Sequence, residues 1–182
     1  VFLTPTSQTA AGPGHYVNGT GATAQTPCTV GAYQPSSAQT TCFAASPGYY
    51  VPVTGQANQT ICNGGTYQPN SGQIFCLESS SGTYVSNTGS SSLSDCSEGT
   101  YQPNSGQSEC IDTSPGYFTS SVRASVQTPC LAGSYQPDPG SITCLQADAG
   151  YHVPIEGQNM QTICPAGQYQ PQPSSTECLI TN

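Results

Sequence analysis

The stretch Cys62–Cys76, CNGGTYQPNSGQIFC, occurs in five versions along the chain. Each version opens with Cys, has Gly three residues later, continues through Tyr-Gln-Pro and closes with Cys. The versions recur every 34 residues without an insertion or deletion. The other four are Cys28–Cys42 (CTVGAYQPSSAQTTC), Cys96–Cys110 (CSEGTYQPNSGQSEC), Cys130–Cys144 (CLAGSYQPDPGSITC) and Cys164–Cys178 (CPAGQYQPQPSSTEC). A repeat this regular indicates tandem copies of one small structural unit.

The 182-residue chain has little material for an apolar core. Leu, Ile, Val and Phe make up about a seventh of it, below the roughly 20% floor for a globular domain. Composition alone would favour disorder, but only 5% of the residues are charged, and disordered chains usually carry many charges. Each repeat instead has two cysteines, and a unit of this size needs a covalent staple.

The charge and hydropathy of the chain argue against nucleic-acid binding and against a membrane span. The formal net charge is -8, and Arg123 is the only Lys or Arg. One such cation cannot neutralise a phosphate backbone, so nucleic-acid binding is excluded. No run approaches the roughly 18 apolar residues that cross a bilayer, so no membrane span is expected in this segment.

Ten regularly spaced cysteines indicate disulfides formed in an oxidising, extracellular compartment. Zinc is disfavoured, because the chain has no C-x-x-C pair and its two histidines share no spacing with the cysteines. The cysteines alternate between gaps of 14 and 20, and two uniform pairings follow. Pairing across 20 leaves Cys28 and Cys178 unpaired, whereas pairing across 14 leaves none. The residue one repeat before Cys42 is Gln8, which also favours the pairing across 14.

The repeat predicts the organisation of the chain. Residues 13–27 align with residues 47–61 at an offset of 34. We therefore expect an N-terminal partial repeat at 1–27 and a partial fifth repeat at 164–182, as in a segment of a longer protein. Four full repeats lie between them, at 28–61, 62–95, 96–129 and 130–163.

Each repeat predicts two short hairpins. Gly and Pro supply turn residues inside each cysteine loop, and the flanking segments are short and β-prone. The stretch between loops, such as 47–60, predicts a second hairpin, and Gly or Pro interrupts every window of helical length. We expect a small disulfide-rich, mostly β or irregular fold, a linear tandem array of 34-residue repeats with no helix. The Ser-rich copy at 79–95 favours a flexible joint or a glycan-bearing face.

The Tyr-Gln-Pro motif has two interpretations. In the structural one, the Tyr ring covers the disulfide, Gln caps backbone groups and Pro sets the turn. In the functional one, a ladder of Tyr rings binds sugars or a partner by stacking.

No pattern in the chain predicts catalysis, a cofactor or a metal site. Of the carboxylates, only Glu78 and Asp112, and Glu109 and Glu177, share repeat positions, which argues against a repeated calcium site. His15 and His152 align with Tyr49 and Tyr50, so they are interpreted as substitutes in aromatic positions. We therefore expect no enzyme.

Glycosylation is predicted from two sequons and from composition. Asn18 and Asn58 begin N-x-T sequons. Ser and Thr are abundant, cluster near Pro and form a tract at 79–94, as in O-glycosylated stalks. We expect covalent N-linked and O-linked glycans.

The pattern C-x-x-G-T-Y-x-x-x-x-G-x-x-x-C, with P-G-Y-Y between copies, resembles the cysteine-rich repeats of ephrin-receptor-like and growth-factor-receptor-like extracellular domains. The resemblance covers about residues 13–178, although this chain has only two cysteines per repeat. Such repeats occur in surface proteins of protists and algae, and algal flagellar hairs (mastigonemes) contain glycoproteins of this general type. The resemblance implies an extracellular surface or flagellar-hair glycoprotein.

Two functions follow as expectations. The strict period and the Ser/Thr-rich, Lys-free composition favour a structural glycoprotein that self-associates into an extracellular filament or coat. The alternative is a ligand-binding receptor or adhesin ectodomain. It predicts one atypical exposed patch, for which Arg123 is the candidate because it replaces the Gly of other copies.

Overall fold

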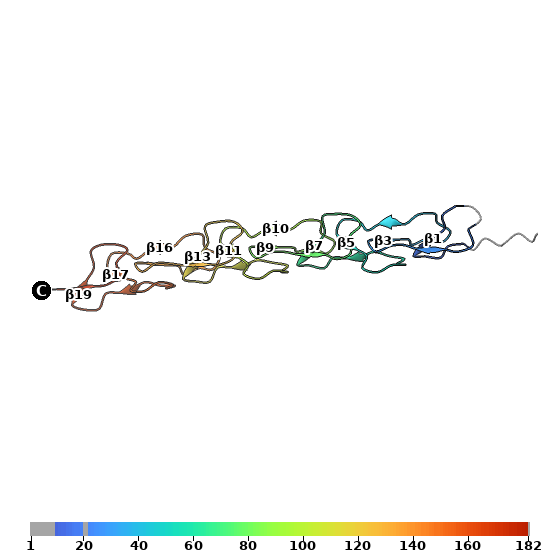
Figure 1. Ribbon diagram of the computed structural model, residues 1–182. Helices are drawn as coiled ribbons and strands as arrows, with labels where there is room; N and C mark the ends of the chain where they lie inside the picture. Colours follow the sequence, from blue (N-terminus) through green and yellow to red (C-terminus); the bar gives the residue numbers. More distant parts are fainter. Residues whose placement is uncertain (1–9, 20–21, 182) are drawn as a thin grey trace, which may run out of the picture. The chain divides into compact units, whose positions relative to one another are not determined.

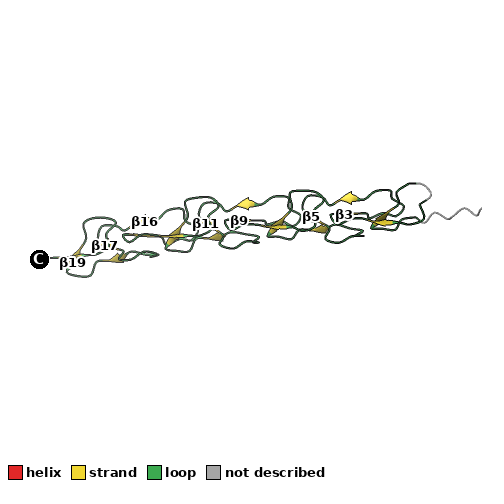
Figure 2. Ribbon diagram, viewed as in Figure 1, coloured by secondary structure: helices red, strands yellow, loops and turns green. Residues whose placement is uncertain are grey.

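The computed structural model describes residues 10–19 and 22–181. In this part of the chain there is no helix (Figures 1 and 2). Every strand has two residues. Each strand pairs antiparallel with one other strand, which gives ten separate hairpins. The expected mostly β or irregular, disulfide-rich repeat fold without a helix is confirmed. Across the described ranges, no segment has the helical length and apolarity needed to cross a membrane.

Five hairpins, here called disulfide hairpins, carry the cysteines. A disulfide joins the two ends of each: Cys28–Cys42, Cys62–Cys76, Cys96–Cys110, Cys130–Cys144 and Cys164–Cys178. Each bond has a sequence separation of 14, which is the pairing that the spacing favours. Their strands are β3 (Ala32–Tyr33) with β4 (Phe43–Ala44), β7 (Thr66–Tyr67) with β8 (Leu77–Glu78), β11 (Thr100–Tyr101) with β12 (Ile111–Asp112), β15 (Ser134–Tyr135) with β16 (Leu145–Gln146), and β19 (Gln168–Tyr169) with β20 (Leu179–Ile180).

The other five, here called intervening hairpins, alternate with them along the chain. Their strands are β1 (His15–Tyr16) with β2 (Thr26–Pro27), β5 (Tyr49–Tyr50) with β6 (Thr60–Ile61), β9 (Thr83–Tyr84) with β10 (Ser94–Asp95), β13 (Tyr117–Phe118) with β14 (Thr128–Pro129), and β17 (Tyr151–His152) with β18 (Thr162–Ile163). The second hairpin expected in each repeat is therefore present, including in the Ser-rich copy at 79–95.

The two kinds of hairpin are structurally equivalent, so the structural period is half of the sequence period. The first strands of successive hairpins begin at evenly spaced positions, His15, Ala32, Tyr49 and Thr66. The positions of the opening cysteines are filled by small buried residues in the intervening hairpins, such as Ala45. Two half-repeats with different sequences thus build the same backbone.

A glutamine replaces the disulfide at the base of most intervening hairpins. Gln59 stands at the position equivalent to Cys76, and its Oε1 accepts a hydrogen bond from the amide of Ser46 at 2.7 Å. Gln25, Gln127 and Gln161 accept the equivalent bond from Gly12, Ser114 and Asp148. In the Ser-rich copy this position is Leu93. The hairpin bases are therefore closed alternately by a covalent bond and, in four of the five intervening hairpins, by a side-chain hydrogen bond.

The core is thin, and about half of it is polar. One column of buried positions is Ala11, Cys28, Ala45, Cys62, Ser79, Cys96, Thr113, Cys130 and Ala147. A second is Val17, Gln34, Val51, Gln68, Val85, Gln102, Thr119, Gln136, Val153 and Gln170. Each buried Gln is bonded at both ends of its amide: Gln68 donates to the carbonyl of Phe75 at 2.8 Å and accepts from the amide of Asn70 at 3.1 Å. The predicted role of Gln as a cap on backbone groups is confirmed.

Backbone hydrogen bonds tie each hairpin to the next. The amide of Gly48 donates to the carbonyl of Gln68 at 2.8 Å, and the amide of Val51 donates to the carbonyl of Gln73 at 2.9 Å. The Gly48 type of bond recurs in successive half-repeats from Gly14 to Gly150, and the Val51 type recurs in most of them. Because few apolar side chains are buried, these hydrogen bonds and the disulfides are the main interactions that hold the hairpins in place. Each disulfide closes a loop of about 15 residues and contributes roughly 3 kcal/mol.

Within each unit, close backbone contact also joins a hairpin to the second one after it. The turn before each first strand puts a glycine such as Gly116 at positive φ, as the third position of a type II turn requires. A Cβ on Gly116 would overlap the carbonyl oxygen of Gly157, which lies two hairpins further on. Gly is therefore required here for two reasons, the backbone angle and the space.

The chain divides into two compact units. Unit 1 is Val1–Ser79 with Val85–Leu93, and unit 2 is Ser80–Tyr84 with Ser94–Asn182. In Figure 1 the labelled hairpins of each unit succeed one another in chain order. The division falls within the Ser-rich copy, for which the sequence favours a joint or a glycan-bearing face.

Arg123 occupies a position where most hairpins have Gly. Its φ is +62°, in the left-handed region. Its Nε lies 3.9 Å from Asp95 Oδ1, and its Nη2 donates to Ser80 Oγ at 3.5 Å. Both charged side chains are about half exposed, and such pairs contribute about 0–1 kcal/mol.

The space requirement predicts unequal effects of two substitutions at the same backbone angle. Gly116 and Gly150 both have φ +88°, but a Cβ on Gly150 would meet no atom within 4 Å. Gly150→Ala should cost roughly 1–2 kcal/mol because of the left-handed backbone. Gly116→Ala should cost about 1–3 kcal/mol more because of the overlap. Denaturant unfolding followed by circular dichroism checks this, and equal losses would contradict it.

The strained backbone at Arg123 predicts that Arg123→Gly stabilises the chain. The left-handed conformation costs a non-glycine residue roughly 1–2 kcal/mol, which exceeds the worth of the exposed ion pair. We expect a rise of about 1 kcal/mol in the free energy of unfolding. Arg123→Ala, which keeps the strain and loses the ion pair, should be no more stable than the parent chain. A loss of stability in Arg123→Gly would show that the side-chain contacts dominate.

Candidate functional site

Each disulfide hairpin pairs a Tyr with a large apolar side chain across its two strands. We call these five pairs the apolar ladder: Tyr33–Phe43, Tyr67–Leu77, Tyr101–Ile111, Tyr135–Leu145 and Tyr169–Leu179. In the first pair the ring centroids lie 6.0 Å apart at an interplanar angle of 49°. Cross-strand neighbours such as these stabilise the hairpin. In these pairs they also present an apolar surface.

The apolar members of the ladder face solvent. Their exposed fractions are 53% for Phe43, 37% for Leu77, 44% for Ile111, 46% for Leu145 and 41% for Leu179. Single exposed apolar residues are ordinary on protein surfaces, whereas a contiguous patch indicates an interaction site. Here an exposed apolar side chain recurs at the same position in all five disulfide hairpins, so these residues are not single, unrelated cases.

The ladder recurs in equivalent surroundings within each unit. In unit 1, a Cβ on Gly31 of the first disulfide hairpin would overlap the carbonyl of Gly72 in the second. In unit 2 the same contact joins Gly99 to Gly140, and Gly133 to Ser174. Consecutive disulfide hairpins thus pack in one repeated way, and their ladder pairs take equivalent positions along the unit.

The sequence carried a signal for the ladder that motif analysis missed. The residue directly after each closing cysteine is Phe or an aliphatic residue in all five copies. The equivalent residue in the intervening hairpins is polar: Thr26, Thr60, Ser94, Thr128 or Thr162. The Tyr of the Tyr-Gln-Pro motif lies on the first strand of each disulfide hairpin, whereas the exposed apolar residue lies on the second strand.

Charge is distributed unevenly around the ladder. Residues 1–77 contain no Asp, Glu, Lys or Arg, and Glu78 is the only such residue in the segments of unit 1. The other eight carboxylates and Arg123 belong to unit 2. The ladder of unit 1 therefore has little electrostatic repulsion to oppose contact with another acidic chain.

A second aromatic position lies beside the disulfides. Three grooves beside disulfides are each lined by a Tyr of the preceding intervening hairpin. Tyr50 lines such a groove of about 250 Å³ with Cys62 and Cys76. Tyr84 and Tyr16 line equivalent grooves of about 300 and 420 Å³, beside Cys110 and Cys42. The Tyr of Tyr-Gln-Pro lies opposite the apolar residue of the second strand in its own hairpin.

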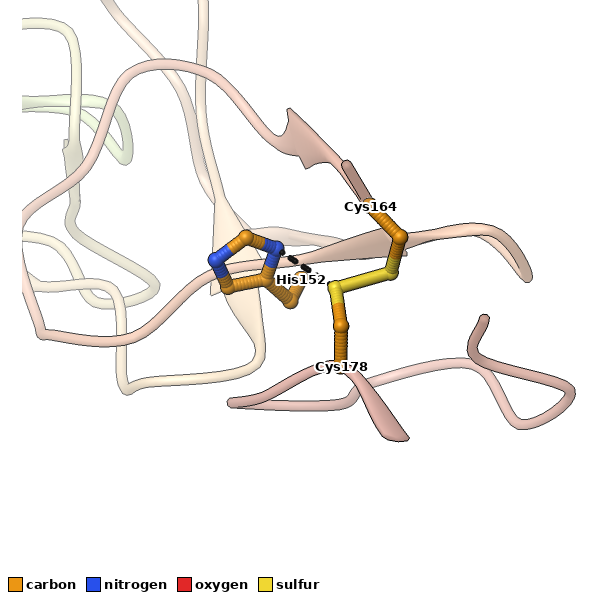
Figure 3. Close-up of side chains that lie close together, drawn as sticks. All are labelled: His152, Cys164 and Cys178. Atoms are coloured by element: carbon orange, nitrogen blue, oxygen red, sulfur yellow. Dashed lines mark hydrogen bonds between the residues drawn. A yellow bond between two sulfur atoms is a disulfide. The ribbon is translucent and has the colours of Figure 1, made fainter. Parts of the chain in front are cut away.

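The two histidines occupy aromatic positions in the strands, as predicted. His15 begins β1, and its Nδ1 lies 3.1 Å from the carbonyl oxygen of Pro13. His152 ends β17, and its Nδ1 lies 3.2 Å from Cys178 Sγ (Figure 3).

One cluster of metal-ligating residue types lies within the described ranges. It contains His152, Cys164 and Cys178, whose ligand atoms lie within 4.8 Å of one another. Figure 3 shows the two sulfurs bonded to each other. Neither sulfur is then a thiolate, which is the form that binds metals. The cluster is therefore a disulfide with an imidazole against it.

The predicted N-glycosylation sites lie at the surface as far as they are described. Asn58 and Thr60 are both exposed. Asn18 is exposed too, but Thr20 of its sequon lies outside the described residues. In the Ser-rich copy, Ser86, Thr88, Ser91 and Ser92 are exposed and accessible to O-glycosylation.

Comparison with known proteins agrees with the repeat pattern. The sequence model of a family described as tyrosine-protein kinase ephrin type A/B receptor-like matches residues 48–96 and 82–130. No curated protein matches the chain. The two family matches begin at residues 48 and 82, which are equivalent positions of successive repeats. The central repeats are thus similar to ephrin-receptor-like repeats, and the chain is a disulfide-stapled, cysteine-rich repeat array whose disulfides and family similarity favour an extracellular location.

Proposed function

We propose that this chain is a structural, glycosylated segment of an extracellular filament or surface coat, which binds further copies of itself through the apolar ladder. The observation that carries the proposal is the recurrence of an exposed apolar side chain at one position of every disulfide hairpin. The similarity to extracellular cysteine-rich repeats and the five disulfides support the location.

A second copy of the chain fits the ladder because its own ladder has the same spacing. Two identical arrays can match at several pairs at once, so that each added contact is made at high effective concentration. Full burial of one Leu, Ile or Phe side chain contributes roughly 1.5–3 kcal/mol, and these are already partly buried. Association costs about 4–15 kcal/mol in lost freedom of motion. Several ladder pairs must therefore engage together, which an array provides.

The proposed role is non-catalytic. The polar side chains that the structure buries are Gln, Ser and Thr, and each is hydrogen-bonded within the array. The carboxylates contribute negative charge at the surface, and the exposed sequon at Asn58 would carry a glycan. A protist or algal surface structure, such as a flagellar hair, is one setting for an assembly of this kind.

The receptor or adhesin alternative is favoured by the grooves beside the disulfides. Each groove offers at least one aromatic ring with hydroxyl or carboxylate groups nearby, as at Tyr84 with Thr100 and Glu109. An aromatic ring with flanking polar groups suits a small polar ligand. Arg123, the candidate for an atypical patch, is paired with Asp95.

The proposal predicts that polar residues in the ladder of unit 1 weaken self-association. Phe43→Thr with Leu77→Thr introduces the residue found at this position in most intervening hairpins, so the hairpins should still form. The control Val30→Thr with Val53→Thr replaces residues of similar exposure, 48% and 52%, outside the ladder. Sedimentation velocity over a concentration series should show at least a tenfold weaker association for the ladder variant, about 1.4 kcal/mol.

The control variant should sediment as the parent chain does. If the parent chain stays monomeric over the concentration range, or if the two variants weaken association equally, self-association through the ladder is wrong. In the first case the grooves beside the disulfides become the next surfaces to test with ligands.

A further inference from the structure

The only Lys or Arg in the sequence, Arg123, lies in the exposed turn between β13 and β14. Its side chain is 57% exposed, and its neighbours Val122 and Val126 are 60% and 68% exposed. Exposed loop tips are the preferred sites of proteolytic cleavage. An endoprotease that requires Lys or Arg before the cut bond therefore has one site in this sequence, the bond Arg123–Ala124, and that site lies at the surface.

The backbone of this turn is held by two hydrogen bonds to the preceding disulfide hairpin. The amide of Arg123 donates to the carbonyl of Cys96 at 2.7 Å, and the carbonyl of Ala124 accepts from the amide of Gln102 at 3.0 Å. A protease binds its substrate in an extended conformation, so both bonds must break before the chain is cut.

The conformation of Arg123 lowers the free energy that this opening requires. Its φ is +62°, a left-handed value that is unfavourable for a residue with a side chain. The strain is released when the turn opens. The equivalent turns of three other intervening hairpins have glycine at this angle: Gly55, Gly89 and Gly157.

The guanidinium of Arg123 is available to a protease. Its Nε lies 3.9 Å from Asp95 Oδ1 and its Nη2 lies 3.5 Å from Ser80 Oγ, both long for a charge-assisted hydrogen bond. Trypsin-like proteases bind the guanidinium with a carboxylate in their specificity pocket. Shorter contacts in that pocket can replace the two that Arg123 makes here.

The disulfides decide what a cut at this bond does to the array. Each disulfide closes its own hairpin, and none joins one hairpin to another. A cut inside a disulfide loop leaves the two pieces joined by the S–S bond. The bond Arg123–Ala124 lies between Cys110 and Cys130, outside every loop. One cut there leaves residues 1–123 and 124–182 without a covalent link.

We propose that Arg123–Ala124 is a proteolytic processing site, at which an arginine-specific endoprotease ends the covalent continuity of the array. One water molecule is consumed. Its oxygen joins the carbonyl carbon of Arg123, which becomes a terminal carboxylate, and its two protons end on the nitrogen of Ala124, which becomes an ammonium group. The proposal does not depend on self-association through the apolar ladder.

The test uses trypsin on the folded 182-residue chain with its disulfides intact. We expect two products, 1–123 and 124–182, that separate on a denaturing gel without reductant. Local opening exposes little surface, so urea well below the unfolding transition should change the cleavage rate by less than about twofold. If the folded chain is not cut, or if the rate rises in step with the globally unfolded population, the proposal is wrong.

A matched variant moves the arginine into a disulfide loop at the same kind of turn. Ala38 is exposed, has φ +57° and lies within the Cys28–Cys42 loop, five half-repeats before Arg123. In the double variant Arg123→Ala with Ala38→Arg, every chain cut after residue 38 should stay in one covalent piece until the disulfide is reduced. Pieces that separate without reductant would contradict the role given to the disulfide loops. The single variant Arg123→Ala should not be cut.

Discussion

The contact between a turn glycine and the carbonyl of a turn two hairpins further on is the constraint that the array depends on. At Gly116 it leaves no room for a Cβ, and it brings hairpins of the same kind together in one fixed way. Hydrogen bonds between adjacent hairpins then satisfy the backbone groups that this close packing buries. A chain with few apolar residues can form an ordered fold in this way, because backbone supplies the contacts that side chains supply elsewhere.

Two different hairpin sequences alternate on one backbone conformation, and each contributes different side chains to the array. Disulfide hairpins carry the covalent staple and the exposed ladder, and intervening hairpins carry the ring beside the next disulfide and, in most copies, a Gln hydrogen bond at the base. Within each unit, each kind contacts the next of its own kind, so a surface feature encoded once per sequence repeat recurs regularly there. The proposed self-association depends on this regular recurrence of an exposed apolar side chain.

Much of the fold was predictable from the sequence, because strict spacing constrains disulfide pairing and Gly and Pro exclude helices. The structural period of half a sequence repeat was not predictable. A disulfide, Cys62–Cys76, closes one kind of hairpin, whereas a hydrogen bond from Ser46 to Gln59 closes the other, so the two sequences do not look alike. The site was less predictable than the fold. Tyr67 belongs to the recurring Tyr-Gln-Pro motif, but the exposure of Leu77 depends on which strand faces solvent. A contact such as His152–Cys178 depends on packing between hairpins.

Residue-resolved amide hydrogen exchange by NMR tests the central claim, that both kinds of hairpin are equivalent members of one array. In unit 1 the amides of Ala45, Gly48 and Val51 make the same backbone bonds as those of Cys62, Gly65 and Gln68. The account predicts similar protection in the two sets, with one maximum in every hairpin. Protection confined to the disulfide hairpins, with only one maximum in each full sequence repeat, would contradict it.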